Sequence, residues 1–193
     1  MSLKIGILGA GNVGGALARV WAAKGHAITF GKRGASNREA ASAAQVVVLT
    51  VPWPAAQEAI KDCGDLSGEI LVDCTNPLSP DLKGLTVGLT TSAGEQVATW
   101  APGAKVVKAF NTIGAGNFGN ADFGGVAADG FYCGDDAASK GVVKGLIADA
   151  GMDPVDVGPL RNARLLEPLA LLWIDLAVNQ KQGSNHAFKL LRR

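Results

Sequence analysis

The chain has 193 residues, a formal net charge of +1, and 48% hydrophobic residues. A charge this close to zero gives no electrostatic reason to expect nucleic acid or an anionic membrane as a partner. No apolar run reaches the roughly 20 residues of a membrane-spanning helix, and the opening apolar run leaves no room for a signal peptide. Cys63, Cys74 and Cys133 have no metal-binding or C-x-x-C spacing, so we expect reduced thiols, no metal and a cytoplasmic protein.

The opening stretch combines an apolar run with three regularly spaced glycines. The run Ile5–Leu8 predicts a buried parallel strand, and a helix is expected to begin at about Gly15. Between them, Gly9, Gly11 and Gly14 have the G-x-G-x-x-G spacing of a dinucleotide site. The first glycine permits a tight turn, the second lets the backbone approach a pyrophosphate, and the third lets helix and strand pack closely. The helix N-terminus then offers free N–H groups to the phosphates.

The end of the next strand distinguishes the two pyridine dinucleotides. NAD sites carry an Asp or Glu there, which accepts a hydrogen bond from the ribose 2′-hydroxyl. Here the strand His26–Phe30 runs into Gly31, Lys32 and Arg33, and the first acid is Glu39. Because Arg and Lys bind a 2′-phosphate that a carboxylate would repel, the pattern favours NADP over NAD. The alternative is that Lys32 and Arg33 are ordinary solvated charges.

Strands and helices continue to alternate, which indicates a parallel sheet. The expected strands cover residues 46–51, 69–74, 105–110, 130–133 and 154–157, and the expected helices lie within 34–45, 55–61, 92–100 and 136–149. Ser92 and Glu95 have the spacing of a capping box, and Asp135 is expected to cap the helix that follows it. The glycine-rich composition of residues 114–125 predicts an ordered loop. The fold class is therefore α/β, with a Rossmann-type doubly wound, mainly parallel sheet.

The last part of the chain has a different pattern. From Arg161 onward Leu recurs at helical spacing, and apolar side chains occupy almost the whole helix circumference as far as Val178. A helix that is apolar on nearly all sides is buried. We therefore predict a nucleotide-binding domain at residues 1–158 and a short helical extension at 159–193. The extension is expected to pack on the domain and across a homodimer interface.

Open parallel sheets bind ligands beyond the carboxyl ends of their strands. The turns that leave the first five predicted strands therefore define the candidate site. Its residues are Gly9, Ala10, Gly11, Asn12, Val13, Gly14, Lys32, Arg33, Val51, Pro52, Trp53, Asn76, Pro77, Asn111, Thr112 and Ala115. Trp53 has two interpretations: a wall beside the ribose or nicotinamide, or a structural aromatic that shields the end of the sheet.

Side chains that could donate a proton are scarce. His26 precedes a strand, at the edge opposite the site, and Lys108 is interior to a strand, where a pairing or edge role is expected. Tyr132 lacks the Lys four residues later that short-chain dehydrogenases use. His186 is the one histidine that could reach a substrate cleft. We therefore predict no catalytic side chain, because hydride transfer between a stacked nicotinamide and a flavin or deazaflavin needs little beyond geometry.

Six segments carry a family resemblance, and together they span nearly the whole chain: residues 7–14, 31–33, 49–53, 107–113, 133–136 and 156–164. On these segments the chain resembles the coenzyme F420-dependent NADP oxidoreductase family. Residues 108–112, Lys-Ala-Phe-Asn-Thr, are also similar to the cytosolic domain of the STEAP metalloreductases. Those proteins use NADPH and a flavin, and their membrane-spanning half has no counterpart in this sequence.

The resemblance implies where the parts of NADP would lie. It assigns the pyrophosphate to residues 10–13, the 2′-phosphate to Lys32 and Arg33, and the nicotinamide end to Pro52, Trp53, Asn76 and Ala115. A deazaflavin or flavin would stack on the nicotinamide under the C-terminal helices. The chain departs from the family pattern in the pocket for this second substrate: Asn111 replaces an expected His, Gly114 replaces an expected Pro, and the connection after Arg33 is short.

Three functions stay open. The first is an NADPH-dependent oxidoreductase that exchanges hydride with F420, FMN or FAD, and the matching turns and the scarcity of proton donors favour it. The second is an NADPH-dependent reductase of a small imine or carbonyl, with Lys181 or His186 as the donor. The third is a non-catalytic NADP sensor whose apolar helix serves oligomerisation alone.

Overall fold

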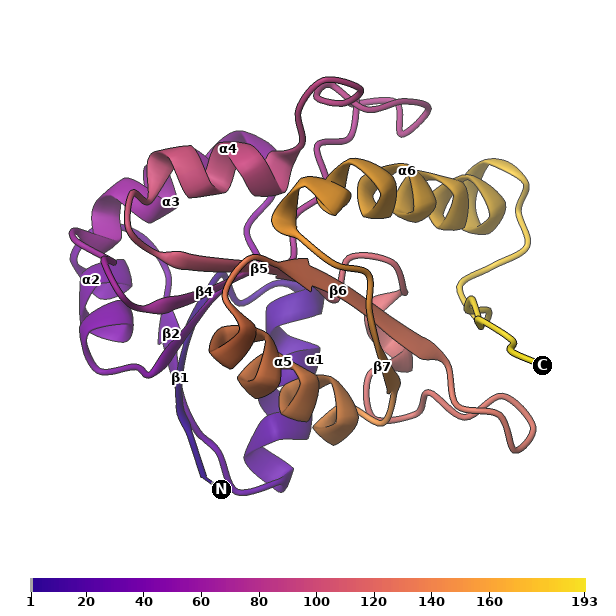
Figure 1. Ribbon diagram of the computed structural model, residues 1–193, viewed down its shortest axis with the longest axis horizontal. Coiled ribbons are helices and arrows are strands. Elements are labelled where there is room, and N and C mark those ends of the chain that lie inside the picture. The colour runs from indigo at the N-terminus through magenta and orange to yellow at the C-terminus, as the bar shows by residue number, and fades with distance from the viewer. Residues whose placement is uncertain (1) are drawn as a thin grey trace.

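A seven-stranded sheet forms the centre of the computed structural model, which describes residues 2–193 (Figure 1). The strand order is β2-β1-β3-β4-β5-β6-β7. All neighbours are parallel except β5 and β6, so the last two strands run against the other five. The strands are β1 Lys4–Leu8, β2 Ala27–Gly31, β3 Val46–Leu49, β4 Ile70–Asp73, β5 Lys105–Ala109, β6 Asp129–Gly134 and β7 Asp153–Asp156.

Helices cover both faces of the sheet, which confirms the doubly wound α/β fold (Figure 1). On one face, α1 (Asn12–Ala23) and α5 (Ala137–Asp149) bury Leu17, Trp21 and Leu146 against the strands. On the other, α2 (Ala35–Ser42), α3 (Ala56–Cys63) and α4 (Ala93–Trp100) close a second apolar layer. Central strands such as β3 are buried along their whole length because both faces are covered.

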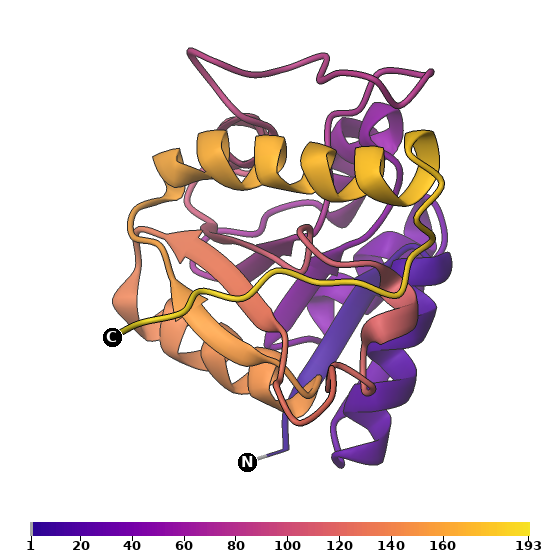
Figure 2. The same cartoon turned by 90° about the vertical axis from the view of Figure 1, so that its right-hand side faces the viewer.

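A third group of elements lies across one edge of the sheet. After the 3-10 turn η3 (Leu160–Asn162), α6 (Ala163–Ile174) crosses above the sheet. The C-terminal segment then runs back below α6 (Figure 2). A π-helical turn, η4 (Asp175–Asn179), ends this helix. The remaining short elements are the 3-10 turns η1 (Trp53–Ala55) and η2 (Ala115–Asn117). Helix α6 lies at the carboxyl ends of β4 and β5, where Asn111, just after β5, donates to the Leu166 carbonyl.

One sequence prediction needs correction. The cap of α5 is Asp136, whose carboxylate accepts from the Ser139 N–H (2.8 Å), whereas Asp135 accepts from the Leu160 N–H. In the single chain the C-terminal helix leaves part of its apolar surface uncovered, since Leu165 is 66% exposed and Leu172 is 49% exposed; burial of that side across a dimer interface stays a prediction. The helix lies on an edge of the domain, so only one of its faces meets other elements.

Candidate functional site

The glycine turn leads directly from β1 into α1. Gly9 has a φ of +106°, a conformation that favours glycine. A Cβ added at Gly14 would lie 2.1 Å from the Gly9 carbonyl oxygen, so the backbones of helix and turn are too close for a side chain at Gly14. A Cβ added at Gly11, by contrast, would meet nothing within 4 Å. Ala10 and Asn12 are exposed beside it. The space in front of the α1 N-terminus is therefore open to a ligand.

Thr50, which sequence analysis missed, holds this turn in place. It follows β3, and its Oγ1 lies 2.9 Å from the carbonyl oxygens of both Leu8 and Gly9. Since β1 is the strand from which the chain winds in opposite directions, the gap between β1 and β3 is the switch point of the sheet, where such folds bind ligands. Many strands are followed by a residue with a hydroxyl group, so the sequence alone could not identify Thr50 as part of the site.

A pocket of about 300 Å³ lies beyond the end of β2 and brings two of the predicted turns together, those after β2 and β3. Lys32 and Arg33 are exposed at its rim. Two acidic residues on α3 also line it, and no sequence signal pointed to them, because they follow Arg33 by more than 20 positions. The lining residues are Lys32, Arg33, Asn37, Val51, Pro52, Ala55, Glu58, Ala59 and Asp62. Trp53 is directed elsewhere and stacks on Trp100 of α4, with ring centroids 5.1 Å apart.

The ends of β4 and β5 present a pair of interlocked amides. Asn76 Nδ2 donates to the Asn111 carbonyl (3.0 Å), and Asn111 Nδ2 donates to Asn76 Oδ1 (3.1 Å) and to the Leu166 carbonyl (3.2 Å). Asn111 is buried, and its Oδ1 has no hydrogen-bond partner among the described residues. Phe110, just before it, has a φ of +63°, a strained conformation that fixes the direction of this turn. An orphaned buried acceptor at the end of a strand is the kind of group that a bound amide satisfies.

Beneath the amides lies a buried cluster of three charges. Lys108 Nζ is 2.9 Å from Asp73 Oδ2 and 3.0 Å from Glu167 Oε1, and all three side chains are at most 1% exposed. The Glu167 carboxylate also accepts from the Ala93 and Gly94 N–H groups at the start of α4. Burial disfavours the ammonium, but the two carboxylates outweigh burial and raise the pKa of Lys108. The cluster ties α6 and α4 to the sheet, which confirms a pairing role for Lys108.

Trp173 of α6 covers the turn after β5. A Cβ added at Gly114 would lie 2.4 Å from Trp173 Cη2. The backbone of Gly114 has φ −69° and ψ 139°, which proline also adopts, so the indole and not the backbone excludes the expected proline. Trp173 Nε1 donates to the His186 carbonyl (2.9 Å), and the two rings stack at 4.7 Å. Asn117 Nδ2 holds the same tail by donating to the Ser184 carbonyl.

The other residues considered for chemistry lie elsewhere. His26 accepts from the Leu3 N–H (3.1 Å) and contacts Asp149 (3.0 Å), at the amino-terminal edge of the sheet. Tyr132 is buried in β6, and Lys181 is exposed after η4. Within residues 2–193 no group of three or more His, Cys, Asp or Glu could hold a metal ion.

A doubly wound sheet, a glycine turn at its switch point and an open helix N-terminus beside a cationic pocket together define a dinucleotide-binding α/β protein. Comparison with known proteins is more specific. The family model "NADP oxidoreductase coenzyme F420-dependent" matches residues 4–38 and 32–77. The F420-dependent NADP reductase of Methanothermobacter marburgensis is 31% identical over 157 residues, which are 77% of this chain and 70% of that protein. The chain therefore belongs to the F420-dependent NADP oxidoreductase family and is an NADP-dependent oxidoreductase.

Two further relatives agree with this assignment. The crystal structure of a candidate F420-dependent NADP reductase from Arthrobacter sp. FB24 has 31% identity and a TM-score of 0.91, and it covers 99% of this chain and 100% of that one. The metalloreductase STEAP3 of Rattus norvegicus is 29% identical over 185 residues, which are 88% of this chain but 37% of that protein. No helix in residues 2–193 is both long and apolar enough to span a membrane.

Proposed function

We propose that the site binds NADP(H) along the carboxyl ends of the strands. The pyrophosphate would lie over the N–H groups of residues 10–13, where the open space above Gly11 gives it room. Lys32 and Arg33 would bind the adenosine 2′-phosphate in the 300 Å³ pocket. The nicotinamide would lie near Asn111 and Ala115, and a rotation of the buried Asn111 side chain would let its unpartnered Oδ1 accept from the carboxamide. Thr112 and Pro77 flank this end.

The proposed reaction is hydride transfer between NADP(H) and a deazaflavin such as F420, or a flavin such as FMN or FAD. Bound NADPH supplies the hydride from its nicotinamide ring. The protein's part is to hold the ring at a fixed position and to exclude water: the Asn76–Asn111 pair fixes the turn after β5, and Trp173 closes the side next to Gly114. The observation that carries the proposal is the open glycine turn next to a pocket with two exposed cations at its rim, in a chain of this family.

Binding tests this proposal first. Replacing Lys32 and Arg33 together by Ala is expected to weaken NADPH binding more than tenfold, about 1.4 kcal/mol or more, and to leave NADH binding unchanged. Lys24→Ala, which removes an exposed cation at the end of α1, is the matched control and should change neither. Equal loss of both dinucleotides, or no loss of either, would contradict the assignment of the 2′-phosphate.

Turnover then separates the acceptors. Stopped-flow oxidation of NADPH should accelerate with F420, FMN or FAD. If a small imine or carbonyl is reduced instead, and Lys181→Ala with His186→Ala abolishes that turnover, the imine or carbonyl reductase is the correct alternative. Tight NADPH binding with no turnover on any acceptor would identify a sensor.

We also propose that the protein is a cytoplasmic homodimer. Three buried free cysteines fit a reducing compartment. Leu165, Leu172 and Val178 are exposed on the outer side of α6 and η4, where a second copy could bury them. Light scattering should give a dimer mass, and Leu165→Glu with Leu172→Glu should give a monomer, whereas Val126→Glu on a distant loop should not. A wild-type monomer would refute the dimer.

A further inference from the structure

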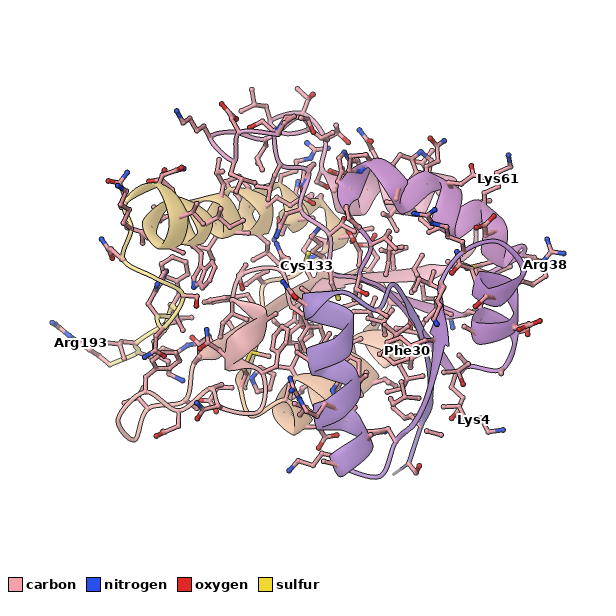
Figure 3. The ribbon with its side chains drawn as sticks, turned by 180° about the vertical axis from the view of Figure 1, so that it is seen from behind. Lys4, Phe30, Arg38, Lys61, Cys133 and Arg193 are labelled. Carbon is pink, nitrogen blue, oxygen red and sulfur yellow. The ribbon has the colours of Figure 1, made fainter. Side chains whose placement is uncertain are left out.

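Asp62 lies at the corner between two hollows of the nucleotide site. It is half-buried in the last turn of α3, and it lines the 300 Å³ pocket described above. It also lines a second hollow of about 320 Å³ on its other side, together with Gly34, Arg38 and Lys61. Figure 3 shows Arg38 and Lys61 extending outward from this corner of the molecule. A carboxylate is thus placed among cations that would otherwise attract an anion.

The carboxylate of Asp62 makes two contacts, and both go to the segment that carries the cations. Its Oδ2 accepts from the Gly34 N–H (2.6 Å) and from Asn37 Nδ2 (3.1 Å). Gly34 is the residue before α2, and as a glycine it has no side chain with which to cap this helix. Asp62 of α3 therefore caps the N-terminus of α2 although it is far away in the sequence. The partial positive charge at that N-terminus stabilises the negative charge of the Asp62 carboxylate.

These contacts fix the position of Lys32 and Arg33. Gly31 ends β2, and the chain must turn within three residues to reach α2. Within this turn, the Lys32 N–H donates to Ser36 Oγ (3.2 Å), and the Gly34 N–H donates to Asp62. The turn is thus held from α2 and from α3. Without Asp62, the turn that carries the two cations would lose the hydrogen bond that joins Gly34 to α3.

A carboxylate at this place has two opposing effects on a 2′-phosphate. Its negative charge repels the phosphate, whereas its hydrogen bonds orient the two cations that bind it. The hydrogen bonds to Gly34 and Asn37 use one oxygen, and that oxygen would persist in an asparagine. The two effects can therefore be separated by substitution.

We propose that Asp62 is a positioning residue that sets the preference of the site for the 2′-phosphorylated dinucleotide, by clamping the turn that presents Lys32 and Arg33. This inference rests on the proposed NADP site. The preference for NAD or NADP is usually predicted from the residues at the end of β2 alone. Here a residue of α3 would contribute to it as well.

The test compares Asp62→Ala with Asp62→Asn in the full-length protein. The dissociation constants of NADPH, NADH and adenosine 2′,5′-bisphosphate are measured by calorimetry, and thermal unfolding confirms that each variant is folded. Asp62→Ala is expected to weaken NADPH and the bisphosphate about tenfold and leave NADH unchanged, which lowers the preference by the same factor. Asp62→Asn keeps the accepting oxygen and should bind NADPH at least as tightly as the wild type.

Glu58→Ala is the matched control, because Glu58 lines the same pocket and carries the same charge but makes no hydrogen bond to the turn in the described structure. Because this variant removes a negative charge from the pocket without touching the turn, its preference for NADPH should be at least that of the wild type. The inference is overturned if Asp62→Ala keeps the wild-type preference, or if Asp62→Asn or Glu58→Ala loses as much as Asp62→Ala does. A wild-type protein without any preference for NADPH would refute the proposed NADP site itself, before the variants are compared.

Discussion

The buried charge cluster at the end of β5 offers a sharp stability test in the variant Lys108→Met. Methionine keeps most of the volume of the lysine stem, so the substitution removes the charge and leaves little cavity. Within residues 2–193, Lys108 is the one cation that forms an ion pair with Asp73 or Glu167, and all three side chains are at most 1% exposed. The wild-type cluster has a net charge of −1, and the variant has two buried carboxylates with a net charge of −2.

The structure indicates how large the loss should be. Removing one partner of a buried ion pair costs about 3–5 kcal/mol, because the remaining charge is neither solvated nor paired. Glu167→Gln should cost less, about 1–3 kcal/mol, since it leaves Lys108 paired with Asp73. Its expected cost comes from α4: the amide has one acceptor oxygen, whereas Ala93 and Gly94 each donate to a different oxygen of the carboxylate.

Urea unfolding followed by tryptophan fluorescence measures both variants, and the double variant completes a cycle. We expect Lys108→Met to lose more stability than Glu167→Gln, and the double variant to lose less than the sum, because removing Glu167 relieves the repulsion that Lys108→Met creates. The reasoning is refuted if Lys108→Met is within about 1 kcal/mol of the wild type, or if the two losses simply add.

Three further predictions test other parts of the structure. Gly114→Ala should destabilise the protein by about 1–3 kcal/mol because the methyl group meets Trp173, and the loss should be smaller in a Trp173→Leu background; equal losses in both backgrounds would contradict the contact. Gly11→Ala should leave the unfolding midpoint unchanged and weaken NADPH binding, whereas Gly14→Ala should lower the midpoint itself, as its Cβ would meet the Gly9 carbonyl; the reverse order would disprove the assignment of the two glycines. Burial, with a smaller contribution from Asp62, raises the pKa of Cys63 from 9.0 to about 11, so the thiol ionises first in the unfolded chain and stability falls as the pH rises from 9 to 11. Cys63→Ala should be spared about 2 kcal/mol of that fall. Urea midpoints are compared below pH 9 and at pH 11, and a decline in Cys63→Ala as steep as in the wild type would rule this out.

Much of the site could be predicted from sequence because its signals are local. The spacing of Gly9, Gly11 and Gly14 specifies a turn between one strand and one helix, and the cations after β2 follow directly from the end of that strand. The pairing of Lys108 could be expected in outline, since a lysine inside a buried strand needs a partner. Its partners could not be named, because Glu167 is 59 positions further along the chain and belongs to a helix whose placement no local pattern encodes.

Local patterns were enough to predict the alternation of strands and helices, the glycine turn and the charge at the end of β2, because each depends on periodicity or spacing within a few residues. Three other features are visible only in the folded chain: the contact of Asp62 with Gly34, the contact of Trp173 with Gly114, and the exposed side of α6. These contacts arise where separate elements pack at the edge of the sheet, and packing depends on the shapes of all the elements together.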